Sequence, residues 1–353
     1  MTAVSLPTDV APTSARPDPA EVDEVFRTIA RRCWHVVARS SDVVPGGLLP
    51  VTLLDEQLVV GRTHEGELLL LDDLCAHRGV RLSMGDLLPT GCVRCPYHGW
   101  QYETDGRCSS IPQLAHDRIP ATARVVSHRV AEQAGMVWAC LVGPDEEMGP
   151  MPVLADAERG DVDLFVGDPL DWGCQAFREI ENFCDVAHFS ILHADTFGNG
   201  REPVIGSYEV VRGDDGRTLS FDVGYPACDP FAEPDAEGHR PSFPSTFGYR
   251  VLAPFTVRLE GAAGPGTVMW IHSTPTSART CRVFWDTVFP AESRTDFAAY
   301  AEFEDKVWGP DRAIVEGQRP ELLPLDLTEE LHLPFDRFAV AYRRVLKEMG
   351  FLV

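Results

Sequence analysis

The stretch GCVRCPYHGW, residues 91–100, decides how the first half of this chain folds. It contains Cys95 and His98 in a Cys-x-x-His pattern, and LCAHRG upstream contains Cys75 and His77 in a Cys-x-His pattern. Each pattern therefore offers one thiol and one imidazole. Two loops that each contribute such a pair predict a site for a metal ion or a metal cluster.

Three interpretations of this four-residue set compete. A structural zinc site accepts two Cys and two His, although zinc fingers usually pair Cys with Cys and His with His along the chain. A Rieske [2Fe–2S] cluster requires the mixture found here, because two thiolates hold one iron and two imidazoles hold the other. Unrelated core residues are the third interpretation. A colourless protein would favour zinc.

The pattern CAHRG…CPYHGW, followed by DGRCSSIP at 105–112, resembles the Rieske domain of Rieske-type non-haem iron oxygenases. This resemblance implies a [2Fe–2S] cluster as cofactor. It implies that Cys75 and Cys95 hold the inner iron, and that His77 and His98 hold the outer, more exposed iron.

The neighbouring cysteines and glycines have simpler roles. Cys92 and Cys108 are predicted not to be metal ligands, because buried free cysteines commonly act as small hydrophobic residues. Gly79 and Gly99 adjoin the two Cys-His pairs and are expected where the loops turn tightly. The chain has ten cysteines in all. They are dispersed and no secretion signal precedes them, so reduced thiols are expected rather than a disulfide framework.

A second set of metal-binding side chains lies in REIENFCDVAHFSILHADTFG, residues 178–198. The set is Glu181, Asn182, Asp185, His188 and His193. Asp185 and His188 share a face of the helix predicted over 175–193. His188 and His193 are separated by about 140° on an ideal helix, so the helix must end or distort between them to bring both to one metal. Two His and one carboxylate form the ligand set of non-haem Fe(II) oxygenases.

The spacing Glu-Asn-x-x-Asp-x-x-His-x4-His is similar to the mononuclear iron motif of the same oxygenase family. The resemblance implies that His188 and His193 are iron ligands. It also implies that Asp185 bridges an iron-bound His to a Rieske His of the neighbouring subunit, which fixes both imidazoles. Asn182 is expected close to the iron, and the position of Glu181 is left open.

The third ligand must come from far along the sequence. The stretch YAEFEDKVWGPDRAIVEGQRPELLP offers the carboxylates of Glu302, Glu304, Asp305, Asp311 and Glu316. A family pattern, Asp-x-x-Ile-x-Glu-x-Gln, resembles DRAIVEGQ. It predicts Asp311 as the ligand, with Asp305 in EDK as the alternative.

The chain of 353 residues is predicted to be α+β. We expect a disordered arm over 1–24, an all-β Rieske domain over 25–150 that begins with a short helix, and a catalytic domain over 151–353. By resemblance, the catalytic domain is a helix-grip (START-like) fold with an antiparallel sheet. Its predicted segments are helices at 175–193, 294–319 and 328–349, strands from about 204 to 290, and a loop at 226–246. A linker is expected at 142–161.

Composition narrows the partners. The formal net charge of −23 argues against binding nucleic acid or an anionic membrane through a basic surface. No apolar run reaches the roughly 18–20 residues that span a bilayer. The N-terminal stretch lacks the features of a signal peptide, and a cytoplasmic protein is predicted.

The resemblance implies a terminal oxygenase of the short, α-only monooxygenase and demethylase branch. Such an enzyme uses O2 and electrons from a separate NAD(P)H-dependent reductase or ferredoxin, and the chain itself has no Gly-x-Gly-x-x-Gly fingerprint. It would hydroxylate or oxidatively dealkylate an aromatic or other hydrophobic small molecule, and it would form a homotrimer. A ring-dihydroxylating dioxygenase, an N-oxygenase and a Rieske electron carrier are alternatives. The expected pocket residues are Phe247, Tyr249, Trp270 and Phe284.

Overall fold

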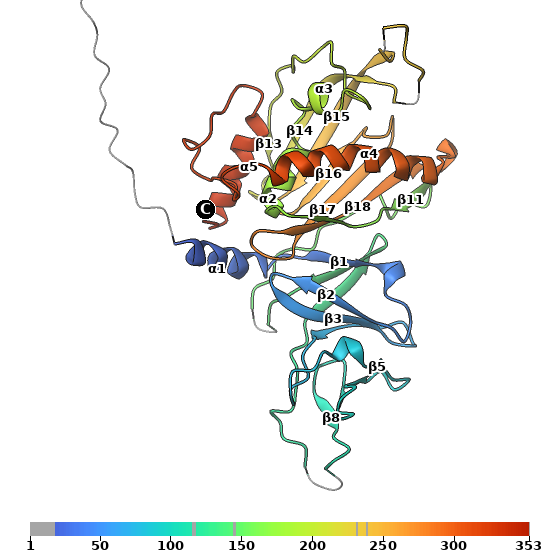
Figure 1. The fold of residues 1–353 in the computed structure, drawn as a ribbon, viewed down its shortest axis with the longest axis vertical. Helices are drawn as coiled ribbons and strands as arrows, with labels where there is room; N and C mark the ends of the chain where they lie inside the picture. Colours follow the sequence, from blue (N-terminus) through green and yellow to red (C-terminus); the bar gives the residue numbers. More distant parts are fainter. Residues whose placement is uncertain (1–17, 115–117, 144–145, 231, 238, 353) are drawn as a thin grey trace, which may run out of the picture.

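The computed structural model describes residues 18–114, 118–143, 146–230, 232–237 and 239–352. The described chain forms two parts stacked along its longest axis (Figure 1). The smaller part consists of short strands, and the larger part is a broad sheet crossed by helices.

Short antiparallel strands build the smaller part. Three sheets have the orders β1-β10-β9, β2-β3-β4 and β5-β6-β7-β8. The strands are β1 His35–Arg39, β2 Leu48–Leu53, β3 Glu56–Arg62, β4 Leu68–Asp72, β5 Asp86–Leu87, β6 Val93–Arg94, β7 Gln101–Tyr102, β8 Cys108–Ser110, β9 Arg129–Gln133 and β10 Met136–Cys140. Single 3-10 turns lie at Ser40–Asp42 and Leu82–Met84. The all-β architecture expected from the Gly-, Pro- and Asp-separated runs is confirmed.

One eight-stranded antiparallel sheet organises the larger part, in the order β11-β18-β17-β16-β15-β14-β13, with β12 also paired to β18. Its strands are β11 Val162–Val166, β12 Leu170–Trp172, β13 Val211–Arg212, β14 Thr218–Cys228, β15 Ser242–Leu252, β16 Thr256–Glu260, β17 Val268–Pro275 and β18 Cys281–Pro290. The helices are α1 Pro19–Ala30, α2 Ala176–Phe183, α3 Phe189–Leu192, α4 Phe297–Glu316 and α5 Arg337–Glu348, with a 3-10 turn at Ala291–Ser293. Figure 1 shows α4 lying across the sheet, as expected of a helix-grip fold.

The two faces of strands β17 and β18 serve different cores. Met269, Ile271 and Trp285 belong to the core shared with the helices. Trp270 and Phe284 point to the opposite face, where they join a core with residues of β1 and β10. Because side chains alternate along a strand, one sheet packs against both the helices and the smaller part.

Helix α1 departs from the prediction for the N-terminus. It begins at Pro19 with Asp18 as its N-cap, so the last residues of the arm predicted over 1–24 are helical, and residues 1–17 lie outside the described chain. The Phe26 ring lies 5.3 Å from that of Phe177 and 5.7 Å from that of Phe351. The helix therefore packs on the larger part, although the sequence grouped it with the smaller one.

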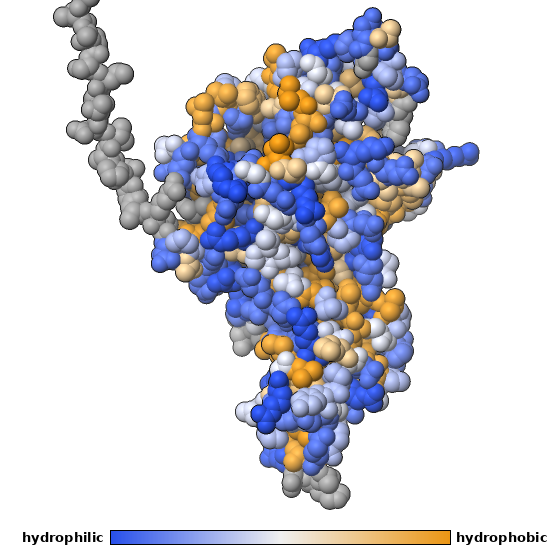
Figure 2. Space-filling view, viewed as in Figure 1, coloured by the Kyte–Doolittle hydropathy of each residue, from blue (hydrophilic) through white to orange (hydrophobic). Residues whose placement is uncertain are grey.

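Other boundaries shift for identifiable reasons. The loop predicted over 226–246 is shorter, because β14 and β15 stay paired as far as Cys228 and Ser242. The linker predicted over 142–161 has no helix or strand in its described residues, and Leu154 anchors it in the core. In the described chain, no helix is long and apolar enough to cross a membrane. Figure 2 shows hydrophilic side chains mixed with scattered hydrophobic ones on the visible face.

Candidate active site

Residues 75–79 and 95–99, here called the cluster loops, have the same design. In each loop, the N–H of the closing glycine donates to the carbonyl of the opening cysteine, at 2.9 Å in the first loop and 3.1 Å in the second. Gly79 and Gly99 have φ angles of 68° and 72°, a region that residues with a Cβ rarely adopt. The tight turns expected beside both Cys-His pairs are therefore present.

The four predicted cluster ligands converge between these loops. The Nδ1 atoms of His77 and His98 lie 3.1 Å apart. Cys75 and Cys95 are 4% and 2% exposed, and their thiols are within hydrogen-bonding reach of each other. A buried sulfur pair beneath a half-exposed imidazole pair matches the expected order of inner and outer iron.

The surroundings of the thiols explain why they suit a metal cluster. Burial, with a smaller contribution from Cys75, raises the pKa of the Cys95 thiol. Two adjacent thiolates are stable here only with a compensating cation. Tyr102 Oη lies 3.1 Å from Cys75 Sγ, and the Trp100 ring stacks on His77 at 4.7 Å. These residues therefore fit a Rieske cluster.

Cys92 and Cys108 have other hydrogen-bonding partners, although Cys108 belongs to the same buried cluster as Cys75 and Cys95. Cys92 Sγ lies 3.7 Å from Ser109 Oγ, and Cys108 Sγ donates to the carbonyl of Ser110 at 3.4 Å. That neither thiol is a cluster ligand stays a prediction.

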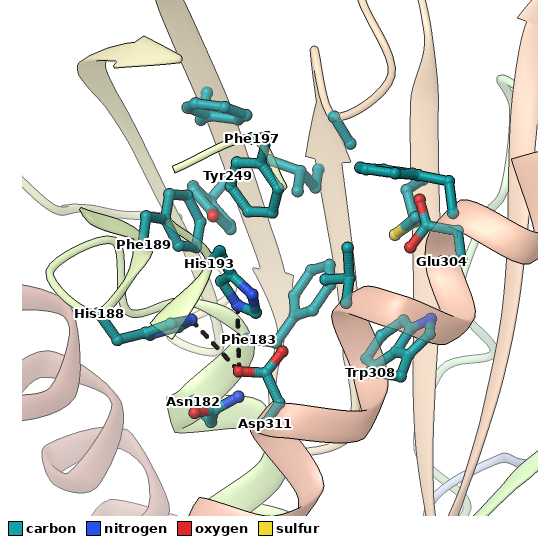
Figure 3. Close-up of a pocket in the computed structure, with 16 residues that line it drawn as sticks. Asn182, Phe183, His188, Phe189, His193, Phe197, Tyr249, Glu304, Trp308 and Asp311 are labelled. Carbon is teal, nitrogen blue, oxygen red and sulfur yellow. Dashed lines mark ion pairs between the residues drawn. The ribbon is translucent and has the colours of Figure 1, made fainter. Parts of the chain in front are cut away.

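His188, His193 and Asp311 meet at the second site (Figure 3). Asp311 Oδ1 lies 3.2 Å from His193 Nε2 and 3.5 Å from His188 Nε2. One ligand atom from each residue lies within 4.8 Å of the other two. Asp311 Oδ1 is buried and has no hydrogen-bond partner in the described chain. Two imidazoles and an unsatisfied carboxylate oxygen fit a divalent iron and leave further coordination positions open.

The helix ends between the two histidines, at Leu192, as predicted, and a further interruption over 184–188 precedes His193 and separates α2 from α3. Helix α2 ends at Phe183, and the four-residue helix α3 separates His188, its N-cap, from His193, its C-cap. Both rings can therefore face Asp311, which one continuous helix would prevent. The Phe197 ring stacks on His193 at 5.0 Å and fixes its orientation.

Asp185 contacts His188 as expected, but from a turn rather than from a helix face. Its Oδ2 accepts a hydrogen bond from His188 Nδ1 at 3.1 Å, and its Oδ1 accepts from the N–H of Ala187 at 2.9 Å. This contact directs the lone pair of His188 Nε2 toward Asp311. The Asp185 side chain is 39% exposed, so one side of it remains accessible.

Helix α4 decides between the two candidate third ligands. Trp308, Asp311 and Val315 are buried on the side of the helix that faces the core. Asp305 is exposed on the other side, so the alternative third ligand is wrong. Pro310 lies inside the helix directly before Asp311.

Glu181 and Glu316, one carboxylate from each motif, have structural roles. Glu181 accepts two hydrogen bonds from Arg343 of α5, at 2.6 and 2.8 Å, and Arg343 also pairs with Glu330 at 2.6 Å. Glu316 accepts from the N–H of Gly173 at 2.7 Å. These bonds fix the positions of α2, α4 and α5 in the fold. They could not be predicted from the sequence, because the partners are distant along the chain.

A cavity opens onto the three-residue site. Its walls are mainly aromatic, with Phe183, Phe189, Phe197, Phe247, Tyr249, Phe303 and Trp308. Asn182 lies beside Asp311 at the cavity floor (Figure 3). Phe247 and Tyr249 were predicted pocket residues and line the cavity. Trp270 and Phe284 do not, because they occupy the opposite face of the sheet.

This fold and these two sites define the catalytic subunit of a Rieske non-haem iron oxygenase. Residues 33–128 match the Rieske [2Fe-2S] domain, and residues 172–350 match the vanillate O-demethylase oxygenase C-terminal domain. The chain belongs to this oxygenase family. Its cofactors are a Rieske cluster and a mononuclear iron, with O2 as co-substrate, and its electrons come from a reductase or ferredoxin.

Similar proteins cover nearly the whole chain. Methylxanthine N1-demethylase NdmA of Pseudomonas putida is 29% identical over 335 residues, which is 92% of this chain and 90% of that protein. The structure of NdmA with caffeine has a TM-score of 0.77 at 28% identity and covers 92% of each chain. Dicamba monooxygenase bound to dicamba, at 20% identity and a TM-score of 0.75, shares the fold.

Proposed function

We propose that this enzyme oxidatively removes a methyl group from a small aromatic or heteroaromatic molecule. The observation that carries the proposal is the aromatic cavity that ends at His188, His193 and Asp311. Flat aromatic walls next to a metal site suit a flat ring. Similarity to NdmA, a demethylase of methylxanthines, supports this reaction over ring dihydroxylation.

The overall reaction balances as R–CH3 + O2 + NADH + H+ → R–H + HCHO + H2O + NAD+, where R ends in nitrogen or oxygen. The methyl carbon is oxidised to formaldehyde, and the substrate atom that carried it gains a proton. One oxygen atom of O2 enters formaldehyde and the other leaves as water. The bound iron supplies the activation of O2.

The residues of the two metal sites and of the cavity have distinct roles in this proposal. Cys75, Cys95, His77 and His98 hold the cluster, and His188, His193 and Asp311 hold the iron. Asp185 orients the His188 ring through the Nδ1 contact. The aromatic walls place the methyl group near the metal and exclude water, which prevents loss of reactive oxygen species.

A homotrimer accounts for the separation of the two sites. The β5–β8 sheet that carries the cluster loops and helix α3 lie toward opposite ends of the molecule (Figure 1). Asp185 and the exposed Phe335 line a surface recess, while Tyr97, within the second cluster loop, is 64% exposed. Two different surfaces that fit each other make a head-to-tail contact, which closes into a ring.

Reconstitution tests the function. The iron-loaded protein, a flavin reductase, NADH and O2 are incubated with a panel of N-methyl and O-methyl aromatics. We expect formaldehyde in equal amount to the demethylated product, and one more iron per chain than the cluster holds. A protein with cluster iron alone, and no substrate-dependent O2 consumption, would instead be an electron carrier.

A further inference from the structure

The cavity has few polar groups beyond the iron site. Of its 16 lining residues, Tyr249, Glu304 and Trp308 contribute a hydroxyl, a carboxyl and an indole N–H to the walls. Glu304 is the one acidic residue of the lining besides Asp311, and no Lys or Arg is among these 16 described residues. The cavity lining can therefore carry negative charge at Asp311 and at Glu304, and the metal would balance the charge of Asp311.

Glu304 lies at the far end of the cavity from the iron site. It shares the buried face of α4 with Trp308 and Asp311, at positions i, i+4 and i+7. The rise of the helix places Glu304 about 10 Å from Asp311 along the axis. Figure 3 shows Glu304 and His188 on opposite sides of the cavity. One ring system bound between them would place its methyl group at the iron and its opposite edge at Glu304.

The chain satisfies only part of the hydrogen-bonding capacity of these groups. Tyr300 hydrogen-bonds to Glu304, and its hydroxyl lies 2.9 Å from Thr287 Oγ1. Tyr249 Oη and Trp308 Nε1 are buried without a partner in the described chain. A buried unsatisfied polar group costs about 1–3 kcal/mol. Groups that line a cavity recover this cost when a ligand pairs with them.

We propose that Glu304 determines substrate specificity by accepting a hydrogen bond from an N–H, O–H or ammonium group of the substrate, opposite the methyl group that is removed. This rests on the proposed function, which makes the cavity the substrate site. The enzyme then selects neutral or cationic methylated aromatics and rejects benzoate-type anions. An anionic edge would face a buried carboxyl, with no Lys or Arg among the described lining residues to offset it.

Because Glu304 ionises as pH rises, its preference for cationic over anionic substrates should depend on pH. Burial raises the pKa of Glu304 to about 7, while the hydrogen bond from Tyr300 opposes the shift. The carboxylate form therefore grows between pH 6 and 8, and the preference for a cation over an anion should grow with it. The other titratable groups that act on it or face it across the cavity are Asp305, Asp311, His188, His193 and Tyr249.

A matched series of ring compounds tests the proposal. The probes are 4-methoxybenzylamine, 4-methoxybenzyl alcohol, 4-methoxytoluene and 4-methoxybenzoate, which differ only in the group opposite the methoxy group. Binding to the iron-loaded enzyme is measured by calorimetry at pH 6, 7 and 8. We expect the amine and the alcohol to bind at least roughly tenfold more tightly than the benzoate, a difference of about 1.4 kcal/mol.

The variant Glu304→Gln keeps the shape and removes the charge. It should bind the amine less tightly, narrow the difference between amine and benzoate, and abolish the pH dependence of that difference. Glu302→Gln, an exposed position on the same helix, should behave as the unmodified enzyme does. A structural role alone would weaken all four probes equally and overturn the proposal.

Binding and turnover separate this proposal from the proposed function. Tighter binding of the benzoate, or no saturable binding of the amine and the alcohol, overturns the role of Glu304. Formaldehyde release from any of the probes in the same experiment would still support demethylation. Preferential binding of the amine without turnover would support Glu304 and count against demethylation.

Discussion

His188, His193 and Asp311 show how three ordinary side chains become a metal site. Two of them flank a single helical turn, and the third arrives from a helix over a hundred residues later. The Asp311 carboxylate is nearly buried, and two imidazole nitrogens lie within 3.5 Å of it. Such a carboxylate is stable when a divalent ion shares it.

Replacement of Asp311 tests this arrangement. We expect Asp311→Ala to lose the mononuclear iron and at least 100-fold in activity, because ligand loss disrupts an open three-ligand site. The red-brown Rieske absorption should persist, as measured by visible spectroscopy alongside iron analysis. Asp305→Ala on the exposed side of α4 is the control and should keep its iron. An iron-replete, active Asp311→Ala enzyme would contradict the assignment.

The cysteines of the opening stretch give a second prediction. Cys95→Ser should abolish the Rieske spectrum, because a hydroxyl is a poor substitute for a thiolate ligand to iron. Cys92→Ser should leave the spectrum unchanged, since the Cys92 thiol contacts Ser109 instead. Electron paramagnetic resonance of the reduced proteins checks both. Loss of the signal in the Cys92 variant alone would reverse the two roles.

At the scale of elements, the interruption between α2 and α3 matters most. Because the short helix α3 begins after His188 and ends before His193, both rings lie at its ends, where they can meet at Asp311. Helix α2 is held by the bonds of Glu181 to Arg343, and α4 by the bond of Glu316 to Gly173. The active site is therefore held by bonds between elements as well as by its metal.

Helix α2 also carries a buried acid with a measurable effect on stability. Burial raises the pKa of Glu179 from 4.5 to about 8. Its protonated form therefore contributes stability that is fully present below pH 4.5 and is lost as pH rises through about 8. Glu179→Gln should unfold at the same denaturant concentration as the unmodified protein at low pH. Above pH 8 it should be more stable, by roughly 5 kcal/mol at most.

Chemical denaturation at several pH values measures this difference. Glu158→Gln, at an exposed site, is the matched control and should show no such dependence. A stability difference between Glu179→Gln and the unmodified protein that does not change with pH would mean that the carboxyl is not neutral in the fold.

For the whole molecule, the central question is how electrons cross from cluster to iron. If they cross between subunits, two inactive variants should restore activity when assembled together. Cys95→Ser lacks the cluster but keeps its iron, and Asp311→Ala lacks the iron but keeps its cluster. Mixed trimers of both place an intact cluster beside an intact iron site. We expect about a quarter of normal activity or less from co-expressed chains.

Each variant alone should remain inactive, which gives the baseline for this experiment. Light scattering should give a mass near three times that of the chain. Mixed assemblies with no activity above that baseline, or an active monomer, would rule out transfer between subunits.

Much of the site could be predicted from the sequence because its ligands lie in short motifs. Cys75, His77, Cys95 and His98 come from two loops, and the geometry within each loop is local. The sequence left both Asp305 and Asp311 as candidates for the third iron ligand, because the choice depends on which side of α4 faces the core. Of the four predicted pocket residues, Phe247 and Tyr249 line the cavity. Trp270 and Phe284 do not, because side chains alternate along β17 and β18 and these two lie on the opposite face of the sheet.

The sequence by itself determined the kind of chemistry: two Cys-His loops for a cluster, and a His pair with acidic neighbours for an iron. It also determined that the helix had to break between His188 and His193. Only the tertiary structure decided which carboxylate completes the site and that Glu304 ends the cavity. The physical reason is that ligand type and local spacing are properties of a segment, whereas burial and direction depend on what other segments pack against it.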